Sequence, residues 1–292
     1  MKALVTGAGG QVARALAVLC PPGVQLLSLG RAELDIGDPA AVQRAVASQR
    51  PDLIINAAAY TAVDKAEGEP ELAQRVNGAG PGHLAAAARE HGARLLHIST
   101  DFVFDGTQSR PYAPADAPRP LGAYGASKLL GEERVQAELG GRAFILRTAW
   151  VYDALGRNFM NTMLKLMRER DGLRVVADQV GAPTHADSIA RALWAAAGRP
   201  ALAGIHHWTD AGVASWYDFA IAIQEEALAR GLLPGAVPVQ PIATADYPTP
   251  ARRPAYSVLD CASTAAALGL TRPHWRASLR ACLDGLAARG RA

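Results

Sequence analysis

The first half of the chain alternates short apolar runs with alanine-rich stretches, and few folds accommodate that alternation. Stretches such as QVARALAVL and SKLLGEERVQAEL are typical of helices. Near-continuous apolar strands separated by helices indicate a parallel sheet covered on both faces. The sequence therefore predicts an α/β fold, a doubly wound, Rossmann-like parallel sheet with right-handed crossovers. The apolar runs are KALVTG (2–7), VQLLSLG (24–30), DLIINAAA (52–59), ARLLHIST (93–100) and AFILRTAWVY (143–152).

The second half of the chain departs from this rhythm. It mixes helical stretches such as NFMNTMLKLMRE with short strands, Gly/Pro turns and a proline-rich segment at 234–256. We expect a dinucleotide-binding domain over 1–152, followed by a smaller C-terminal, substrate-binding lobe made mostly of 153–292. Some segments of it, about 185–212, are expected to return to the sheet. The lobe should lie over the carboxyl edge of the strands, where open α/β sheets bind ligands.

Composition argues against several other classes of protein. Half of the 292 residues are hydrophobic, but no run of 18 apolar residues occurs, so no membrane span is expected. The formal net charge of +3 is spread along the chain and gives no reason to expect a nucleic-acid partner. The N-terminus has no signal-peptide pattern, which predicts a cytoplasmic protein. Cys20, Cys261 and Cys282 lack CxxC spacing and are expected to be free thiols.

A glycine turn directly after the first apolar run predicts a dinucleotide site. Gly7, Gly10 and Ala13 have the spacing GxxGxxA. Gly7 allows a tight turn, Gly10 lets the backbone approach a pyrophosphate, and a helix from Gln11 points its first amides at the phosphates. A lone glycine motif is a weak signal, but this one stands between the first strand and the first helix of a βαβ pattern.

The end of the second run favours NADPH over NADH. An acidic residue there would bind a ribose 2′-hydroxyl, whereas Arg31 offers a guanidinium that suits a 2′-phosphate. A solvated surface arginine is the alternative. Asp35 and Ile36 could frame the adenine. The small residues that follow the third run leave room for a cofactor and are Ala57, Ala58 and Ala59.

Thr100, Tyr124 and Lys128 form the candidate catalytic set. Tyr124 and Lys128 are four residues apart, so a helix presents both on one face. A tyrosine with a pKa of about 10 is a poor acid or base at neutral pH, and a nearby ammonium is expected to lower that pKa. Thr100 ends the fourth run and can offer a hydroxyl to a substrate carbonyl.

Several motifs together resemble a known family. TGAGGQ, NAAAYTAVDKAE, STDFVFDG, YGASKLLGE, RTAWVY and ARRPAYSVLD are similar to those of the extended short-chain dehydrogenases and, more narrowly, of the dTDP-4-dehydrorhamnose reductases. The likeness covers essentially the whole chain. It implies that Thr100, Tyr124 and Lys128 are catalytic and that Asp101 and Trp150 contact substrate. It also implies cofactor contacts at Gly10, Gln11, Val12, Arg31, Asp35, Ile36, Ala57, Ala58, Ala59 and Lys128.

The resemblance implies a function. NADPH would reduce the C4 ketone of dTDP-4-dehydro-β-L-rhamnose to give dTDP-β-L-rhamnose, with NADH left open as a second cofactor. Two alternatives remain: another nucleotide-sugar epimerase or reductase of the superfamily, and a non-catalytic regulatory subunit with the same fold. Steady NADPH consumption with a dTDP-4-keto sugar would separate them.

Two departures from the family pattern bear on this expectation. The family often has Gly where this chain has Ala13. Some members carry, at the position of Ala15, a Glu used in a metal-linked dimer, so we expect no metal and a monomer or weak homodimer.

A few other residues have a structural and a functional interpretation. Arg253, beside Arg252, is expected to bind the substrate diphosphate unless it belongs to a solvated loop. Trp150 could equally be a core residue on sequence grounds alone. Asp178 and Thr184 are turn-forming residues first and ligand contacts second. The pair at 206–207 is expected to be structural.

Overall fold

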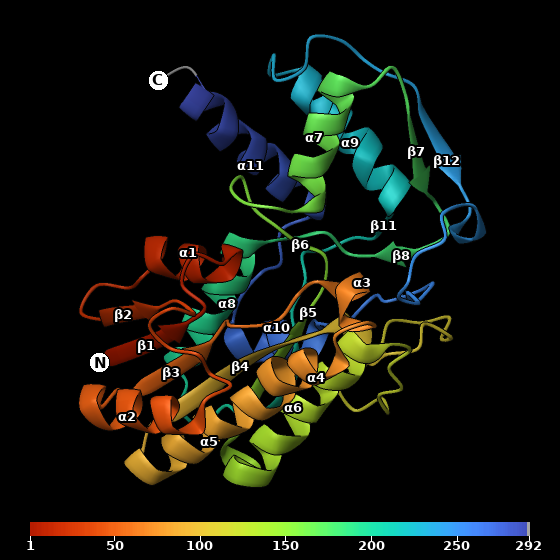
Figure 1. Cartoon of the computed structure of the whole chain (residues 1–292). Helices are drawn as coiled ribbons and strands as arrows, with labels where there is room; N and C mark the ends of the chain where they lie inside the picture. The colour runs from red at the N-terminus through yellow and green to blue at the C-terminus, as the bar shows by residue number, and fades with distance from the viewer. Residues whose placement is uncertain (291–292) are drawn as a thin grey trace.

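Six parallel strands form the central sheet in the computed structural model, which describes residues 1–290 (Figure 1). Their order is β10-β5-β4-β3-β1-β2. The chain starts in β1, forms the neighbouring edge strand β2, and then crosses to β3 and adds the other strands out to β10 at the opposite edge. This confirms the predicted doubly wound, Rossmann-like sheet. The strands are β1 (Lys2–Thr6), β2 (Gln25–Leu29), β3 (Leu53–Asn56), β4 (Arg94–Thr100), β5 (Phe144–Thr148) and β10 (Gly204–His207).

Helices cover both faces of the sheet. One face packs against α1 (Gln11–Val18) and α8 (Ala186–Ala197), with α10 (Ala262–Leu268) beside α8. The other packs against α2 (Pro39–Gln49), α5 (Gly80–His91) and α6 (Ala123–Leu139). Between β3 and α5 the chain forms the short helices α3 (Val63–Ala66) and α4 (Pro70–Ala73) and a π-helix, Gln74–Ala79.

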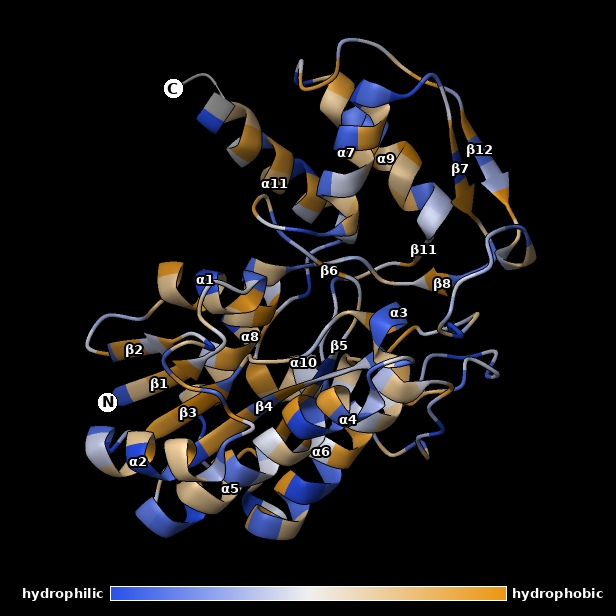
Figure 2. Ribbon diagram, viewed as in Figure 1, coloured by the Kyte–Doolittle hydropathy of each residue, from blue (hydrophilic) through white to orange (hydrophobic). Residues whose placement is uncertain are grey.

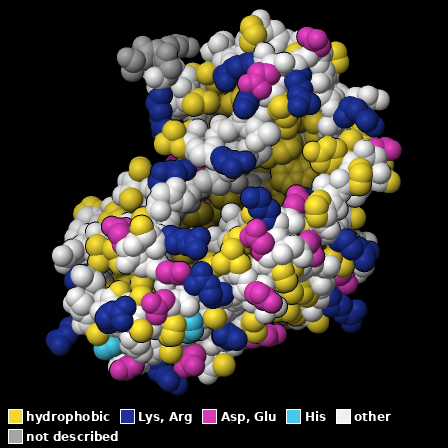
Figure 3. Space-filling view, in the orientation of Figure 1, with side chains coloured by type: hydrophobic (Ala, Val, Ile, Leu, Met, Phe, Trp, Pro, Cys, Tyr) yellow, Lys and Arg dark blue, Asp and Glu magenta, His cyan; other side chains and the backbone are white. Residues whose placement is uncertain are grey.

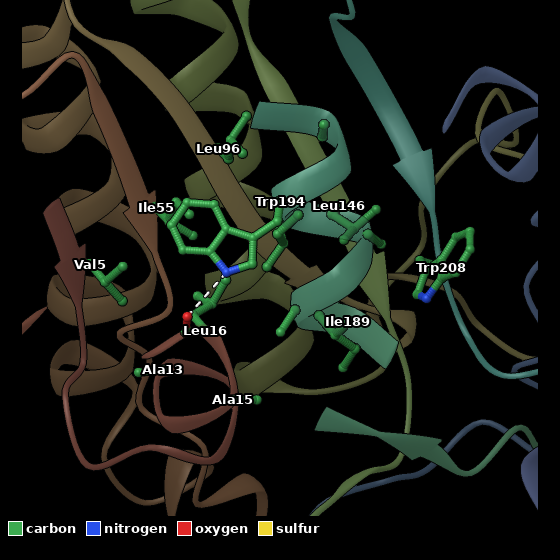
Figure 4. Close-up of a cluster of buried hydrophobic side chains, with 14 of the residues drawn as sticks. Val5, Ala13, Ala15, Leu16, Ile55, Leu96, Leu146, Ile189, Trp194 and Trp208 are labelled. Carbon is green, nitrogen blue, oxygen red and sulfur yellow. Dashed lines mark hydrogen bonds between the residues drawn. The ribbon is translucent and has the colours of Figure 1, made fainter. Parts of the chain in front are cut away.

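The strands are apolar on both faces because both faces are buried, as their colouring in Figure 2 shows. Val5 packs toward α1 and α8, whereas its neighbour Leu4 packs toward α2 and α5. In the first of these cores the Trp194 indole lies among the strand side chains and donates to the Leu16 carbonyl at 3.1 Å (Figure 4). Because side chains alternate along a strand, this alternation also decides to which face of the sheet the last residues of each strand point.

The smaller lobe has its own core. Helices α7 (Phe159–Glu169), α9 (Trp216–Leu228) and α11 (Trp275–Gly290) pack together beside the paired strands β7 (Leu173–Val176) and β12 (Val239–Ile242). The helices α8 and α10 and the strand β10 also come from beyond residue 152, yet they lie in the larger unit (Figure 1).

The predicted strand at 143–152 is divided in two. Strand β5 ends at Thr148, the backbone turns through Trp150 at a φ of +48°, and Val151–Tyr152 form β6, which pairs with β9 (Thr184–His185). A second short pair, β8 (Val180–Gly181) with β11 (Ala214–Ser215), lies alongside at the junction of the lobes (Figure 1). The break matters because it turns Trp150 toward the cavity.

No helix within residues 1–290 is long and apolar enough to cross a membrane.

Candidate active site

A cavity of about 790 Å³ lies along the carboxyl ends of the central strands, and Figure 3 shows a hollow between the two lobes. It brings together all of the residues predicted from the sequence as cofactor or substrate contacts. Asp178 and Thr184 do not line it. The predicted residues along its wall are Gly7, Gly10, Gln11, Val12, Arg31, Asp35, Ile36, Ala57, Ala58, Ala59, Thr100, Asp101, Tyr124, Lys128, Trp150 and Arg253.

The turn between β1 and α1 brings two backbone segments into contact. Gly7 has a φ of +77°, and a Cβ placed on it would lie 2.8 Å from the Cα of Ala58. Glycine is therefore required both by the left-handed backbone and by the lack of space. The Gly10 amide donates to the Gly7 carbonyl at 3.0 Å, and α1 begins at the next residue. The first residues of α1 line the cavity, in a geometry suited to an anionic ligand.

Arg31 lies at the end of the cavity that follows β2. It is exposed, and no acidic residue within 1–290 forms an ion pair with it. Asp35 pairs instead with Arg75 at 2.9 Å. Burial raises the pKa of Asp35, but hydrogen bonds from Arg75 and the Gly37 amide hold it below its usual value. This end of the cavity thus carries a guanidinium free to meet a phosphate. Arg75, remote in sequence, was not predicted.

Helix α6 brings Tyr124 to the end of β4. Gly125 makes this possible, because a Cβ at that position would collide with the Phe102 carbonyl oxygen. The rings of Phe102 and Tyr124 meet edge to face, with centroids 5.5 Å apart. Glu67 accepts a hydrogen bond from the Ala123 amide at 2.8 Å and so satisfies one of the free donors at the start of the helix.

Lys128 lies one helical turn further along α6 and is almost fully buried. Its Nζ donates to the Ile98 carbonyl at 2.7 Å. Burial lowers the pKa of Lys128 to about 8, and Glu132 acts in the opposite direction. The expectation that this ammonium gives Tyr124 a lowered pKa is wrong, because burial outweighs any such effect. Burial raises the pKa of the Tyr124 phenol to about 12, although the Thr100 hydroxyl opposes the rise.

Asp101 follows Thr100 and is buried at the edge of the sheet. The Thr100 hydroxyl donates to Asp101 Oδ1 at 3.1 Å and also accepts from the Phe102 amide at 3.2 Å. Burial raises the pKa of Asp101 to about 6, against several hydrogen bonds that lower it. A polar strand end therefore faces the phenol of Tyr124. The phenol can donate to a carbonyl oxygen, whereas Thr100 has to turn its one hydroxyl proton away from Asp101 to do the same.

Trp150 and Trp216 form a stacked pair across the lobe junction. Their ring centroids are 3.5 Å apart and the planes differ by 4°. Trp150 has a φ of +48°, which is uncommon for a bulky residue and costs backbone energy. Trp216 begins α9, lines the same cavity, and donates from its indole to Gln179 at 3.2 Å. No pattern in the sequence points to Trp216, since its contact with Trp150 depends on how the two lobes pack together.

Arg253 is already paired. Its guanidinium nitrogens meet the two oxygens of Asp64 at 3.0 and 2.8 Å, and this hydrogen bonding lowers the pKa of Asp64 despite burial. Arg253 can therefore make the expected contact with the substrate diphosphate only if it binds Asp64 and the diphosphate together or exchanges Asp64 for the diphosphate. Arg253 still lines the same cavity as the glycine turn, although the two are far apart in the sequence.

Three potential metal ligands meet at the lobe junction, namely Asp153, His185 and Cys282, with ligand atoms within 4.8 Å of one another. Asp153 is already engaged, by the Arg14 guanidinium at 3.3 Å and by the Ala154 amide at 2.7 Å. Burial, with Asp153 and other acids nearby, raises the pKa of the Cys282 thiol to about 12. In these contacts the cluster joins the chain after β6 to β9 and to α11 at the lobe junction.

The protein has a doubly wound parallel sheet with a glycine turn after its first strand. A threonine, a tyrosine and a lysine converge at the ends of its strands. These features together define the class of nicotinamide-dependent short-chain oxidoreductases. Comparison with known proteins narrows the class. The family described as RmlD substrate binding domain matches residues 1–288. The chain belongs to this family.

Named relatives and solved structures agree. A dTDP-4-dehydrorhamnose reductase of Burkholderia thailandensis is 46% identical, with 98% of this chain and 99% of the relative covered. A crystal structure of a dTDP-4-dehydrorhamnose reductase from Clostridium acetobutylicum has a TM-score of 0.92 at 39% identity, covering 98% of this chain and 99% of that one. Another, from Bacillus anthracis in complex with NADP, has a TM-score of 0.91 at 34% identity, covering 97% and 99%.

Proposed function

We propose that the chain catalyses the NADPH-dependent reduction of the C4 ketone of dTDP-4-dehydro-β-L-rhamnose, which yields dTDP-β-L-rhamnose. Family membership supports the reaction class, and the relatives' names support the substrate. The observation that carries the proposal is the convergence of Thr100, Tyr124 and Lys128 in the cavity that also contains the glycine turn.

The cavity fits a phosphorylated dinucleotide. The tight turn at Gly7 leads into Gly10 and the first residues of α1, which line the cavity, so a pyrophosphate can approach the backbone there. Arg31 has no ion-pair partner within residues 1–290 and is placed to meet a 2′-phosphate. The solved relative from Bacillus anthracis was obtained with NADP. When bound, NADPH supplies the hydride that reduces the C4 carbonyl carbon.

The remaining roles belong to this chain's own side chains. Tyr124, protonated because burial raises the pKa of its phenol to about 12, donates its proton to the oxygen that gains charge. Thr100 hydrogen-bonds the same oxygen from the strand end. Lys128 holds the ribose of the nicotinamide. Burial keeps the resting pKa of the Tyr124 phenol high, and the Lys128 ammonium acts only as the phenol gives up its proton, by attracting the negative charge that its oxygen gains. Arg253 and Asp101 bind the substrate.

The lobe made mostly of 153–292 binds the nucleotide sugar in this proposal. Trp150 and Trp216, stacked on each other, both line the cavity where the two lobes meet. A sugar ring or a pyrimidine has a face that packs well on an indole. A dTDP-sugar is therefore the expected partner, in a protein that acts as a monomer or a weak homodimer.

The test is a substrate panel followed by NADPH absorbance. Stoichiometric NADPH loss with the dTDP-4-keto sugar, and formation of dTDP-rhamnose, is the expected result. Product isomerisation without net NADPH loss would instead identify an epimerase. Absence of turnover with intact NADPH binding would favour a non-catalytic subunit. The UDP-glucose 4-epimerase of Thermus thermophilus, 23% identical with a TM-score of 0.82, shares the fold alone, so the panel includes UDP-sugars.

A further inference from the structure

Helix α6 carries a third polar side chain on the face that holds Tyr124 and Lys128. Glu132 follows Lys128 by four residues, as Lys128 follows Tyr124, so the three lie along one side of the helix. Glu132 is 1% exposed, and the proposed reaction gives it no role. A carboxylate is seldom buried this completely without a partner.

The partners of Glu132 come from the two strands beneath α6. Arg147 on β5 meets the carboxylate twice, with Nε 2.9 Å from Oε1 and Nη2 2.6 Å from Oε2. The Ser99 hydroxyl on β4 donates to Oε1. Ser99 and Arg147 are paired in the sheet register. One carboxylate therefore joins α6 to both strands at a single point.

That point lies one residue behind the reacting edge. The next pair in the register is Thr100 with Thr148, and both line the cavity. Any shift of α6 along β4 and β5 would move Lys128 relative to Thr100. The ion pair therefore sets the relative position of the two elements that supply the catalytic side chains.

A contribution to the stability of the fold does not by itself explain why Glu132 and Arg147 form a buried ion pair. Arg147 is 1% exposed, its guanidinium lies 5.1 Å from the centre of the Phe104 ring, and its Nη1 has no hydrogen-bond partner within residues 1–290. Desolvating two charges is expensive, and apolar side chains of similar volume often hold a core at least as well. The charges of Glu132 and Arg147 are better explained by an effect on a neighbour.

That neighbour is Lys128. Burial lowers the pKa of Lys128, and Glu132 is the charged group that raises it. His97 beneath it is neutral, because burial and Lys128 itself lower its pKa, and its Nδ1 is 3.0 Å from the Asn56 amide. The titratable and charged groups around Lys128 are His97 on β4, Asp101 after β4, Tyr124 and Glu132 on α6, and Arg147 on β5.

We propose that Glu132, held by Arg147 and Ser99, is a positioning residue of the active site: it fixes α6 against β4 and β5 and keeps a negative charge beside the Lys128 ammonium. The inference rests on the proposed function, which assigns Lys128 to the nicotinamide ribose and the Tyr124 phenol. The acting form of Lys128 is the ammonium, so activity is lost as pH rises through its pKa. Without Glu132 that pKa falls further, and the alkaline limb moves to lower pH.

The main test is the double variant E132M/R147M, which replaces the ion pair with apolar side chains of similar length. The fold is expected to survive, with a melting temperature close to that of the wild type. Loss of the Glu132 carboxylate lowers the pKa of Lys128, and loss of the Arg147 cation opposes this. Because Glu132 is the group whose charge raises the pKa of Lys128, we expect the alkaline limb of kcat/KM to move to lower pH, by less than about one unit. A stable double variant with the wild-type pH profile would overturn the proposal.

Two further variants sharpen the test. E226M/R280M removes a Glu–Arg pair of the smaller lobe, where the two atoms are 2.7 Å apart, and is expected to leave the profile unchanged. E132D keeps the negative charge, but its side chain is one methylene shorter and reaches Arg147 and Ser99 less well. We therefore expect kcat to fall while the alkaline limb of the pH profile stays in place. Should the double variant not fold, a wild-type kcat in E132D would itself contradict the positioning role.

NADPH binding, measured by nicotinamide fluorescence over the same pH range, separates this inference from the proposed function. A wild type that binds NADPH but does not turn over the dTDP-4-keto sugar fails the proposed function only. Loss of NADPH affinity at lower pH in E132M/R147M than in the wild type would still support the role of Glu132. Identical binding profiles in the two proteins would refute it.

Discussion

Tyr124 holds its proton at any pH near neutrality, because burial raises the pKa of the phenol to about 12. A reductase needs this form, since the side chain has to give a proton to an oxygen that becomes basic only as the hydride arrives. The lowered pKa expected from the neighbouring Lys128 is not found, and the resting phenol remains the predicted proton donor. A buried tyrosine beside a lysine serves as an acid in its resting state.

Removing the Tyr124 hydroxyl tests this role directly. Tyr124→Phe keeps the ring that packs on Phe102 but loses the proton donor. Loss of a positioned general acid lowers kcat by about 10²–10⁴. NADPH affinity and melting temperature should stay near wild-type values, as measured by fluorescence titration and thermal unfolding. Turnover within about threefold of the wild type would remove Tyr124 from the mechanism.

Arg31 provides a second test at the scale of one residue. A guanidinium facing a 2′-phosphate contributes about 1.5–3 kcal/mol, which is roughly a ten- to hundredfold preference for NADPH over NADH. Arg31→Ala should therefore raise KM for NADPH strongly and leave KM for NADH nearly unchanged. Arg44→Ala, an exposed arginine on α2 outside the cavity, is the matched control. Equal constants for both cofactors in the wild type would mean that Arg31 faces solvent.

At the scale of elements, the residues that sequence could identify are those fixed by local rules. Spacing at i and i+4 put Tyr124 and Lys128 on one helix face, and the position of Gly7 after a strand identified the turn. Trp216 and Arg75 were missed because each reaches the site through contacts between distant segments. No local pattern encodes such contacts, since they depend on how whole elements pack.

The division of the run at 143–152 shows the same limit. Its apolar residues look continuous, yet β5 ends at Thr148 and the left-handed backbone of Trp150 redirects the chain. Trp150 can hold that conformation because it packs on Trp216 and because Gly181 leaves space for the indole. Trp216 and Gly181 are both distant from Trp150 in the sequence. Tertiary packing therefore overrides the local backbone preference of Trp150.

Gly125 allows the packing of α6 to be tested as an element. A methyl group there would collide with the Phe102 backbone oxygen, which cannot move aside as a flexible side chain can. Gly125→Ala should destabilise the protein by about 1–3 kcal/mol and lower kcat, because it pushes Tyr124 away from Thr100. Urea unfolding and steady-state kinetics measure the two effects.

The matched control for this change is Gly285→Ala on α11. No atom lies within 4 Å of a Cβ placed there, so the substitution removes a poor helix former without a clash. We expect it to be neutral or to stabilise by about 0.5–1 kcal/mol, with unchanged kcat. Similar destabilisation in both variants would show that the effect of Gly125→Ala is not due to the contact with Phe102.

At the scale of the whole molecule, the site exists only where the two lobes meet. Arg14, on α1 of the larger unit, donates to Asp153 at 3.3 Å and to the Leu155 carbonyl at 2.8 Å, and so ties the cofactor helix to the chain entering the smaller lobe. The stacked indoles of Trp150 and Trp216 make a second link. Both links join the two lobes directly.

Chelation should therefore leave the protein unchanged. Hard divalent cations need several oxygen ligands, and Ala15 offers none, since its methyl group lies in the core and is 4% exposed. Asp153 is paired with Arg14, and the pKa of the Cys282 thiol is raised to about 12 by burial. We predict that EDTA alters neither kcat/KM nor the sedimentation coefficient, with added Mg²⁺ or Zn²⁺ as the control. Dissociation of an oligomer on chelation, or activity that returns only with added metal, would show that a cation holds this molecule together.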